Sequence, residues 1–196
     1  MTTKKSRARG RPRRFDPEQA VATAQRLFHT HGYDAVSVAD VTDALGINPP
    51  SFYSAFGNKA GLYTLVLGRY ATTAAIPLDD LLRSDRTVAE SLAAVLKDAA
   101  HRYAADPCAS GCLVLEGLHS DDAIARTAAR TAHAAAEDTL RRYIAERHPE
   151  QAACLTDFVS TTMAGLSAKA RNGHDLDRLL ATVGLANLSV AHALEI

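Results

Sequence analysis

Tryptophan is absent from this 196-residue sequence, and aromatic residues make up only 6% of it. Sheet-forming sequences are enriched in aromatic and β-branched residues, whereas alanine, which is abundant here, favours helices. The sequence also lacks any apolar run near the roughly 18 residues that a membrane-spanning helix needs. We therefore expect an all-α protein with no membrane partner.

Motifs of the common enzyme classes are missing as well. The sequence contains no G-x-S-x-G nucleophile elbow, P-loop, H-E-x-x-H motif or dinucleotide-binding fingerprint. These absences predict a protein that is not an enzyme and needs no cofactor. It has only three cysteines, and no apolar segment follows its basic N-terminus, so we expect reduced thiols and a cytoplasmic location.

Positive and negative charges balance overall, with 22 Lys and Arg against 22 Asp and Glu, but they are unevenly distributed. Seven of the bases fall within residues 1–14, which contain no acid. The rest of the chain therefore has 15 bases against 22 acids, a net charge of −7. Because a block of like charge is typically disordered when free and serves as an interaction tail, we expect residues 1–14 to be a flexible basic arm.

Capping signals and apolar residues at helical spacing continue along the rest of the chain. Asp16 and Pro17 are typical of a helix start, Ser37 and Asp40 form a capping-box pattern, and Gly46 and Gly57 are typical of helix ends. No β-hairpin signal is present. With their capping residues, we expect nine helices, over residues 16–30, 37–45, 48–56, 59–75, 87–105, 111–118, 121–147, 151–171 and 175–194.

The first three of these helices fall within about 45 residues, and a glycine-containing turn joins the second and third. This spacing is typical of a helix-turn-helix DNA-binding unit. The third helix of such a unit needs a core face and a face of small or polar residues that can approach base edges. We expect the core side to hold Ala44, Leu45, Phe52 and Phe56, and the other face to hold Asn48, Ser51, Tyr53 and Ser54.

The stretch from Val36 to Tyr63, VSVADVTDALGINPPSFYSAFGNKAGLY, resembles the signature of the TetR family of bacterial transcription regulators. In that signature a helix-turn-helix is followed by a Tyr-x-x-Phe-x-x-Lys segment. The match extends from about Phe15 to Tyr63, a quarter of the chain. More weakly, Gly165–Val183 is similar to the last two helices in one large branch of the family.

The resemblance implies a helix-turn-helix domain over residues 15–60 and a larger helical ligand-binding and dimerisation domain over residues 61–196, with about nine helices in all. It also implies a homodimer in which residues 151–171 and 175–194 of each subunit form a four-helix bundle. Such a regulator binds a palindromic operator in double-stranded DNA and is released when a small-molecule inducer binds. We expect the protein to repress transcription rather than activate it, because most relatives are repressors.

The resemblance also implies roles for individual residues. The helix Asn48–Phe56 matches the recognition helix that enters the major groove, and Tyr53 matches a tyrosine that contacts a phosphate. Lys59 matches a lysine that meets the DNA backbone, and Ser37 matches a hydroxyl residue beside a phosphate. The sequence departs from the commonest pattern at Pro49 and the proline after it, where a lysine and a small residue are frequent, so one phosphate-binding amine is missing.

The folded part of the expected DNA-binding domain is itself acidic. Residues 15–60 hold two bases against five acids. Because phosphate contacts supply most non-specific affinity for DNA, the arm must provide them, and its Arg-Gly-Arg-Pro-Arg sequence suits a narrow A·T-rich minor groove. The expected DNA-binding residues are Arg9, Arg11, Arg13, Ser37, Asn48, Pro49, Ser51, Tyr53, Ser54 and Lys59.

Two cysteines, Cys108 and Cys112, lie close together beside Gly111. Thiolates at short spacing suit soft metals and redox chemistry, and some relatives that share the Gly-Cys-Leu segment are thought to respond to copper or oxidants. However, C-x3-C is not a zinc-ribbon spacing, no second pair exists, and free cysteines often pack in apolar segments. Core packing is therefore one interpretation, and a metal- or oxidant-responsive repressor that senses through these thiols is the alternative.

An inducer cavity is expected among the middle helices, where apolar and polar side chains mix in an alanine-rich surrounding. A stripe of this kind is more often part of a plain core. The candidate pocket residues are Tyr103, Cys108, Cys112, His133, Phe158 and Met163.

Overall fold

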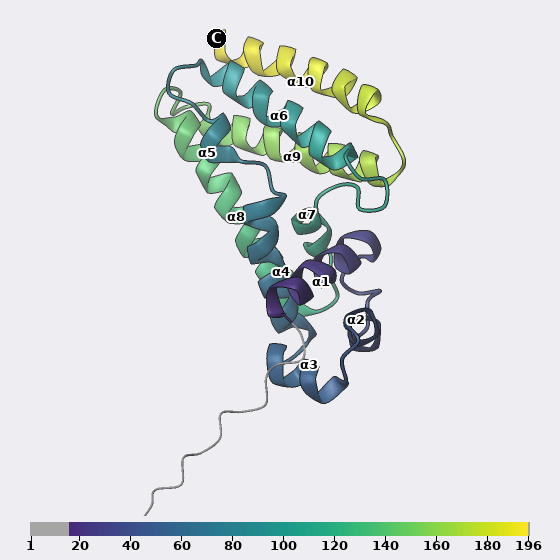
Figure 1. Ribbon diagram of the computed structural model, residues 1–196. Coiled ribbons are helices and arrows are strands. Elements are labelled where there is room, and N and C mark those ends of the chain that lie inside the picture. Colours follow the sequence, from purple (N-terminus) through teal and green to yellow (C-terminus); the bar gives the residue numbers. More distant parts are fainter. Residues whose placement is uncertain (1–15, 196) are drawn as a thin grey trace, which may run out of the picture.

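The computed structural model describes residues 16–195, and every regular element in that range is a helix (Figure 1). The expectation of an all-α fold is confirmed. The ten helices are α1 (Pro17–His31), α2 (Val38–Leu45), α3 (Pro49–Phe56), α4 (Lys59–Thr73), α5 (Leu78–Leu81), α6 (Val88–Ala104), α7 (Leu113–Gly117), α8 (Ala123–Ala145), α9 (Ala152–Arg171) and α10 (Leu176–Glu195).

Nine of these helices match the expected ones, with ends that differ by no more than about two residues. The additional helix is α5, a single turn that begins after Pro77 and has no side-chain cap. None of the helices described is long and apolar enough to span a membrane. The expected basic arm, residues 1–14, lies outside the described residues.

The helices are divided between two hydrophobic cores. One core is formed by α6, α9, α10 and the C-terminal half of α8, which gather at one end of the molecule (Figure 1). The other core is formed by α1–α4 at the opposite end, with Leu113 of α7 and Ala125 and Ala129 of α8. We call the end formed by α1–α4, which holds the expected helix-turn-helix, the DNA-binding end. Its core extends beyond residue 60, the expected domain boundary, and includes side chains of α7 and α8.

Local capping explains where the first helices begin. The Ser37 hydroxyl accepts a hydrogen bond from the Asp40 backbone N–H at 3.1 Å, and the Asp40 carboxylate accepts one from the Ser37 backbone N–H at 2.7 Å. This reciprocal pair satisfies two N–H groups that a helix start leaves without partners. Asn48 and Asn58 cap α3 and α4 with their side-chain oxygens, which accept from the N–H groups of Ser51 and Gly61.

A polar junction connects the end of α1 to the loop before α7 and to α9. The His29 ring Nε2 lies 3.1 Å from the Gly111 carbonyl oxygen. Arg171 donates from Nη1 to the carbonyls of His29 and Ser110, at 3.3 and 3.1 Å, and its Nε lies 3.1 Å from Glu116 Oε2. These contacts hold the DNA-binding end against the larger domain.

A second junction lies on the other side of the α1–α2 loop. The Tyr33 hydroxyl donates to the Asp122 carboxylate at 2.8 Å, and the Asp34 carboxylate accepts from the Ser120 hydroxyl at 2.9 Å and the Asp121 N–H at 3.0 Å. The loop that starts α8 is thus tied to the loop that ends α1. Both junctions are long-range in sequence, so helical periodicity does not reveal them.

Gly117 allows α7 to approach α4 and α8 closely. A Cβ atom at this position would overlap the Tyr63 hydroxyl and lie 2.9 Å from the Ala129 Cβ. Gly68, in the exposed middle of α4, has no atom within 4 Å of the position a Cβ would take. The two helical glycines therefore differ in their surroundings while sharing the same backbone conformation.

We predict that Gly117→Ala lowers the free energy of unfolding by about 1–3 kcal/mol, because the methyl group has no room. The matched control Gly68→Ala should raise it by about 0.5–1 kcal/mol, because alanine favours a helix where space is open. Urea unfolding at one fixed protein concentration measures both effects. A stability gain in the Gly117→Ala protein would contradict the close packing described here.

Acidification should weaken the His29 junction. Burial lowers the pKa of His29 below its ordinary value of 6.5, and Arg171 lowers it further, although the Gly111 carbonyl and the carboxylates of Asp106 and Glu116 oppose this. The folded state therefore binds fewer protons than the unfolded state, and its stability falls as the pH drops below 6.5 and through the folded pKa.

The His29→Gln variant keeps an N–H donor but does not titrate. We predict that its melting temperature falls less than that of the wild type when the pH is lowered from about 7.5 to about 5.5. His31→Gln is the matched control, since His31 is an exposed residue at the end of the same helix. It should retain the wild-type response. Equal acid sensitivity in the wild type and His29→Gln would show that the junction does not depend on a neutral His29.

Candidate functional site

The turn between α2 and α3 presents one face of α3 to solvent. Gly46 adopts the left-handed conformation, with φ of 61°, and Phe52 and Phe56 are buried. On the opposite face the side chains of Pro49, Tyr53 and Ser54 are exposed, and Tyr53 is 52% exposed. The expected division of this helix into an anchored face and an accessible face is confirmed, although Ser51 is half-buried.

The expectation for Ala44 was wrong, because this residue is exposed. The inward stripe of α2 consists of Val41 and Thr42, which are buried, with Val38 and Leu45 half-buried on either side. Ala44 lies beside this stripe. A helix of eight residues has room for only one such stripe.

Two of the expected DNA-binding side chains already have a structural role as helix caps. The Ser37 hydroxyl donates to the Asp40 carboxylate at 2.7 Å, and these Ser37 bonds hold the pKa of Asp40 below its ordinary range. A phosphate at Ser37 would therefore meet a neighbouring carboxylate. The Asn48 side-chain oxygen accepts from the Ser51 N–H at 3.0 Å, which leaves the amide nitrogen of Asn48 as the donor that can face a base edge.

Lys59 lies at the start of α4, and its amine points back to the α1–α2 loop. Nζ donates to the carbonyls of Tyr33 and Val36 at 3.1 and 3.0 Å, and it lies 4.0 Å from the centre of the Tyr33 ring. An ammonium group has three protons, so one remains for another acceptor. In this structure Lys59 links α4 to the loop, and its expected phosphate contact stays a prediction.

The described part of this surface contains few bases. Among residues 16–60 the bases are Arg26 and Lys59, and the Lys59 amine is already bound to carbonyls. The expected contacts from Arg9, Arg11 and Arg13 lie outside the described residues and remain predictions.

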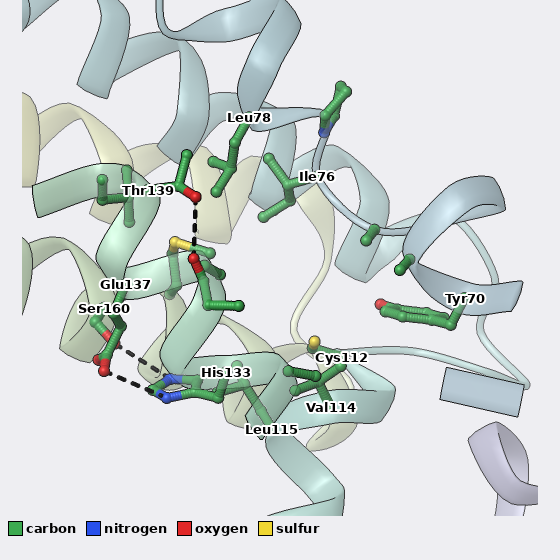
Figure 2. A pocket seen from close by; sticks show the side chains of 18 of the residues that line it. Tyr70, Ile76, Leu78, Cys112, Val114, Leu115, His133, Glu137, Thr139 and Ser160 are labelled. Carbon is green, nitrogen blue, oxygen red and sulfur yellow. Dashed lines mark hydrogen bonds and ion pairs between the residues drawn. The ribbon is translucent and has the colours of Figure 1, made fainter. Parts of the chain in front are cut away.

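A cavity of about 520 Å³ opens between α4, the segment around α5, and helices α6–α9 (Figure 2). This volume is in the range of small-molecule sites. Four of the six expected pocket residues line it: Tyr103, Cys112, His133 and Met163.

The other two expected residues do not line this cavity. Cys108 is exposed in the loop before α7, and Phe158 is 37% exposed on the outer side of α9. An irregular loop has no period from which the direction of Cys108 could be inferred. Phe158 lies on the same helix as Met163, but five residues apart on an α-helix place the two side chains well apart around its circumference.

The polar end of the cavity is formed by three side chains from α8 and α9 (Figure 2). The Ser160 hydroxyl donates to Glu137 Oε1 at 2.6 Å and lies 3.3 Å from His133 Nε2. His133 Nδ1 lies 3.6 Å from Glu137 Oε2. Glu137 and Ser160 were not anticipated from the sequence; the position of Glu137 four residues after His133 was the available signal.

The other wall is aromatic. Tyr70 of α4 and Tyr103 of α6 are buried beside Cys112, and burial, followed by the influence of the Cys112 thiol, raises the pKa of both phenols. Both phenols therefore stay neutral. The enclosed Tyr103 hydroxyl makes no hydrogen bond of ordinary geometry within residues 16–195, although it faces the Cys112 side of the cavity. Tyr70 was not anticipated from the sequence.

The cysteines of the described chain are free thiols. Within residues 16–195 no group of three or more His, Cys, Asp or Glu side chains is arranged to hold a metal ion. Cys112 lines the cavity and Cys108 does not. The structure thus gives no support to a metal site shared by these two residues.

The outer faces of α9 and α10 are apolar. Leu185 and Leu188 of α10 are each 69% exposed, and Phe158 of α9 is also exposed. Gly165 and Gly184 lie on the same two helices, with open space where a side chain would be. Contiguous exposed apolar surface often marks a site of protein–protein contact.

Comparison with known sequences is consistent with this architecture. A sequence model of bacterial regulatory proteins of the tetR family matches residues 20–66. The HTH-type transcriptional repressor BdcR of Escherichia coli K12 is 57% identical over 195 residues, covering 100% of this chain and 99% of the relative. The HTH-type transcriptional repressor ComR of the same organism is 30% identical over 189 residues, covering 91% and 90% of the two chains.

Solved structures share the whole fold. The TetR family regulator CifR, as a cysteine mutant complexed with 26bp double-strand operator DNA, is similar with a TM-score of 0.81 and 30% identity, covering 90% of this chain and 98% of that chain. The reduced form of E. coli NemR is similar with a TM-score of 0.68 at 17% identity, covering 87% and 94%, which supports the fold alone. Because the match to BdcR extends over the full chain at 57% identity, this chain belongs to the TetR family of bacterial regulatory proteins.

Proposed function

We propose that this protein is a ligand-responsive transcriptional repressor that binds a palindromic operator as a homodimer. The observation that carries the proposal is the accessible face of α3, whose buried side is anchored by Phe52 and Phe56. The relatives BdcR and ComR are named as repressors, and CifR has been solved on operator DNA. A helix with one anchored face and one accessible face is what a major-groove reader needs, which supports this proposal.

In this proposal the exposed residues of α3 contact the major groove, and Tyr53 contacts a phosphate. The Tyr53 hydroxyl has no hydrogen-bond partner among the described residues, so it is free to donate. The basic arm, residues 1–14, supplies most of the charge that draws the protein to DNA, because the described part of the DNA-binding end carries more acids than bases.

The test begins with a duplex selected by the purified chain from a random-sequence library. We predict an inverted repeat whose half-sites lie about one helical turn apart or a multiple of it. Tyr53→Phe should weaken binding about tenfold, because it removes a hydrogen bond to a charged phosphate, and leave the free energy of unfolding within about 0.5 kcal/mol. Fluorescence anisotropy at several salt concentrations measures the affinities.

In the same assay, removing residues 1–14 should weaken binding. The slope of log affinity against log salt concentration should become less steep by about 0.9 for each phosphate that the arm neutralises. Arg141→Ala, which removes an exposed base from α8, is the control for a general loss of charge. It should bind as the wild type does. An unchanged slope after truncation would refute the role of the arm, and failure to select any repeat would refute operator binding.

We propose that α9 and α10 form the dimer interface. Leu185, Leu188 and Phe158 leave an apolar surface on these two helices, and the open glycines allow close approach of a second copy. A two-fold axis through this surface would pair the same helices of both subunits in a four-helix bundle and place two copies of α3 on one side of the molecule.

We predict that Leu188→Asp converts the protein to a monomer and lowers its operator affinity at least about tenfold, because a monomer can occupy only one half-site at a time. Ile124→Asp is the matched control, since Ile124 is 64% exposed but lies at the start of α8. Sedimentation equilibrium measures the oligomeric state. A Leu188→Asp protein that remains dimeric would contradict this interface.

The cavity is positioned to influence α3. Leu67, Tyr70 and Ala71 of α4 line the cavity, and the same helix begins beside the end of α3. Cys112 also lines it and follows Gly111, whose carbonyl is bound by His29 of α1. A ligand that prefers a shifted position of α4 or of this loop would change the placement of the DNA-binding end and favour release.

A further inference from the structure

The charged groups around the cavity are all acidic, apart from one histidine. Glu137, Asp79 and Asp80 line it, and no Lys or Arg does so among the described residues. Asp79 and Asp80 are exposed on the α5 turn, and Glu137 lies on α8 with 31% of its side chain exposed. The charge of the lining therefore disfavours an anionic ligand.

Three bases that contact or adjoin residues of the lining have other partners. Arg102 is paired with Asp98 and donates to the Ala74 carbonyl. A neighbouring hollow beside Asp79 is lined by Arg142 and Arg147, but Arg142 donates to the Asp138 carbonyl and Arg147 to the Ser84 carbonyl. These two bases partly offset Asp79, so the argument depends mainly on Glu137.

Glu137 is held in a fixed position. One carboxylate oxygen accepts from the Ser160 hydroxyl at 2.6 Å, and the other lies 3.6 Å from His133 Nδ1 (Figure 2). An apolar ligand that fills the cavity displaces water from this carboxylate. A carboxylate that loses water without gaining a close cation is costly, so a ligand with its own positive charge is favoured over a neutral one.

The rest of the lining suits the body of such a ligand. Leu67, Ile76, Leu78, Leu140 and Met163 provide an apolar surface, and the neutral ring of Tyr70 extends it at the end of the cavity opposite Glu137 (Figure 2). The carboxylate at one end and the apolar and aromatic lining of the rest therefore match an amine attached to an apolar body.

We infer that the effector of this protein is an apolar organic cation, an amine or ammonium compound whose nitrogen lies beside Glu137. This inference rests on the proposed ligand-responsive function and specifies the chemistry of its effector. Helix α8 supplies the charge, the α5 turn supplies two further carboxylates, and α4 and α6 supply the aromatic wall.

The test uses three probes with one apolar body: phenylbutylamine, phenylbutanol and phenylbutanoate. Isothermal titration calorimetry with the full-length protein, free of DNA, should show the ammonium form bound at least about tenfold more tightly than the alcohol, and the carboxylate bound most weakly. Because this comparison uses the wild-type protein, it does not depend on the folding of any variant. An alcohol or carboxylate that binds as tightly as the amine, or an amine that does not bind, overturns the inference.

The Glu137→Gln variant tests whether the Glu137 carboxylate is the group that binds the amine. This variant keeps an oxygen that can accept from Ser160, and it should reduce the preference for amine over alcohol to within about threefold. Asp138→Asn is the matched control, because Asp138 is on the same helix and does not line the cavity. It should keep the wild-type preference. A full preference in Glu137→Gln would show that the amine binds elsewhere and would also overturn the assignment.

Release of a selected operator duplex is measured separately with the same probes. If the amine binds but the duplex stays bound, the ligand chemistry stands and the proposed response to it fails. If the alcohol or the carboxylate binds more tightly and releases the duplex, the response stands and the inferred ligand chemistry fails.

Discussion

Three aromatic rings hold the DNA-binding end together. Phe28 of α1, Tyr33 of the following loop and Tyr63 of α4 lie with ring centres 4.8–5.5 Å apart and are buried. Such tilted and edge-on pairs add stability beyond the apolar area that they bury. Since the Lys59 amine lies over the Tyr33 ring, the start of α4 is fixed to the same cluster. The orientation of α3 depends on this arrangement, because Phe52 and Phe56 pack into the same core.

The larger domain shares helices with this cluster. Helix α4 contributes Tyr63 and Val66 to the core of the DNA-binding end, and Leu67 and Tyr70 to the cavity wall one turn further on. A shift of α4 that enlarges the cavity therefore also moves side chains packed against α1 and α7. The polar junctions of His29 and Tyr33 with the rest of the molecule oppose such a shift. Under the proposed function, a ligand with higher affinity for the shifted state would supply the free energy for it.

Features with local causes could be predicted from the sequence, whereas features made by long-range packing could not. The caps Ser37 and Asn48, the anchors Phe52 and Phe56, and the ends of nine helices follow from interactions between residues a few positions apart. The hydrogen bond from the Tyr33 hydroxyl to the Asp122 carboxylate joins residues 89 positions apart, and no periodicity in the sequence predicts it.

The cavity shows the same difference. Tyr103, His133 and Met163 were predicted because apolar and polar residues mix on their helices, but Glu137, Ser160 and Tyr70 gain their role only when α4, α8 and α9 come together. Ala44 was assigned to the core from its apolar character, yet its position on a short helix turns it to solvent.

The inclusion of Leu113, Ala125 and Ala129 in the core of α1–α4 has a consequence for evolution and for protein engineering. A segment cut at residue 60 would expose the apolar surface that α7 and α8 now cover. The helix-turn-helix segment is therefore not a module that can be transferred intact to another regulator. Under the proposed function, new target sequences would be reached more readily by exchanging the outward-facing residues of α3 one at a time, since these residues carry none of the packing that joins the two ends of the molecule.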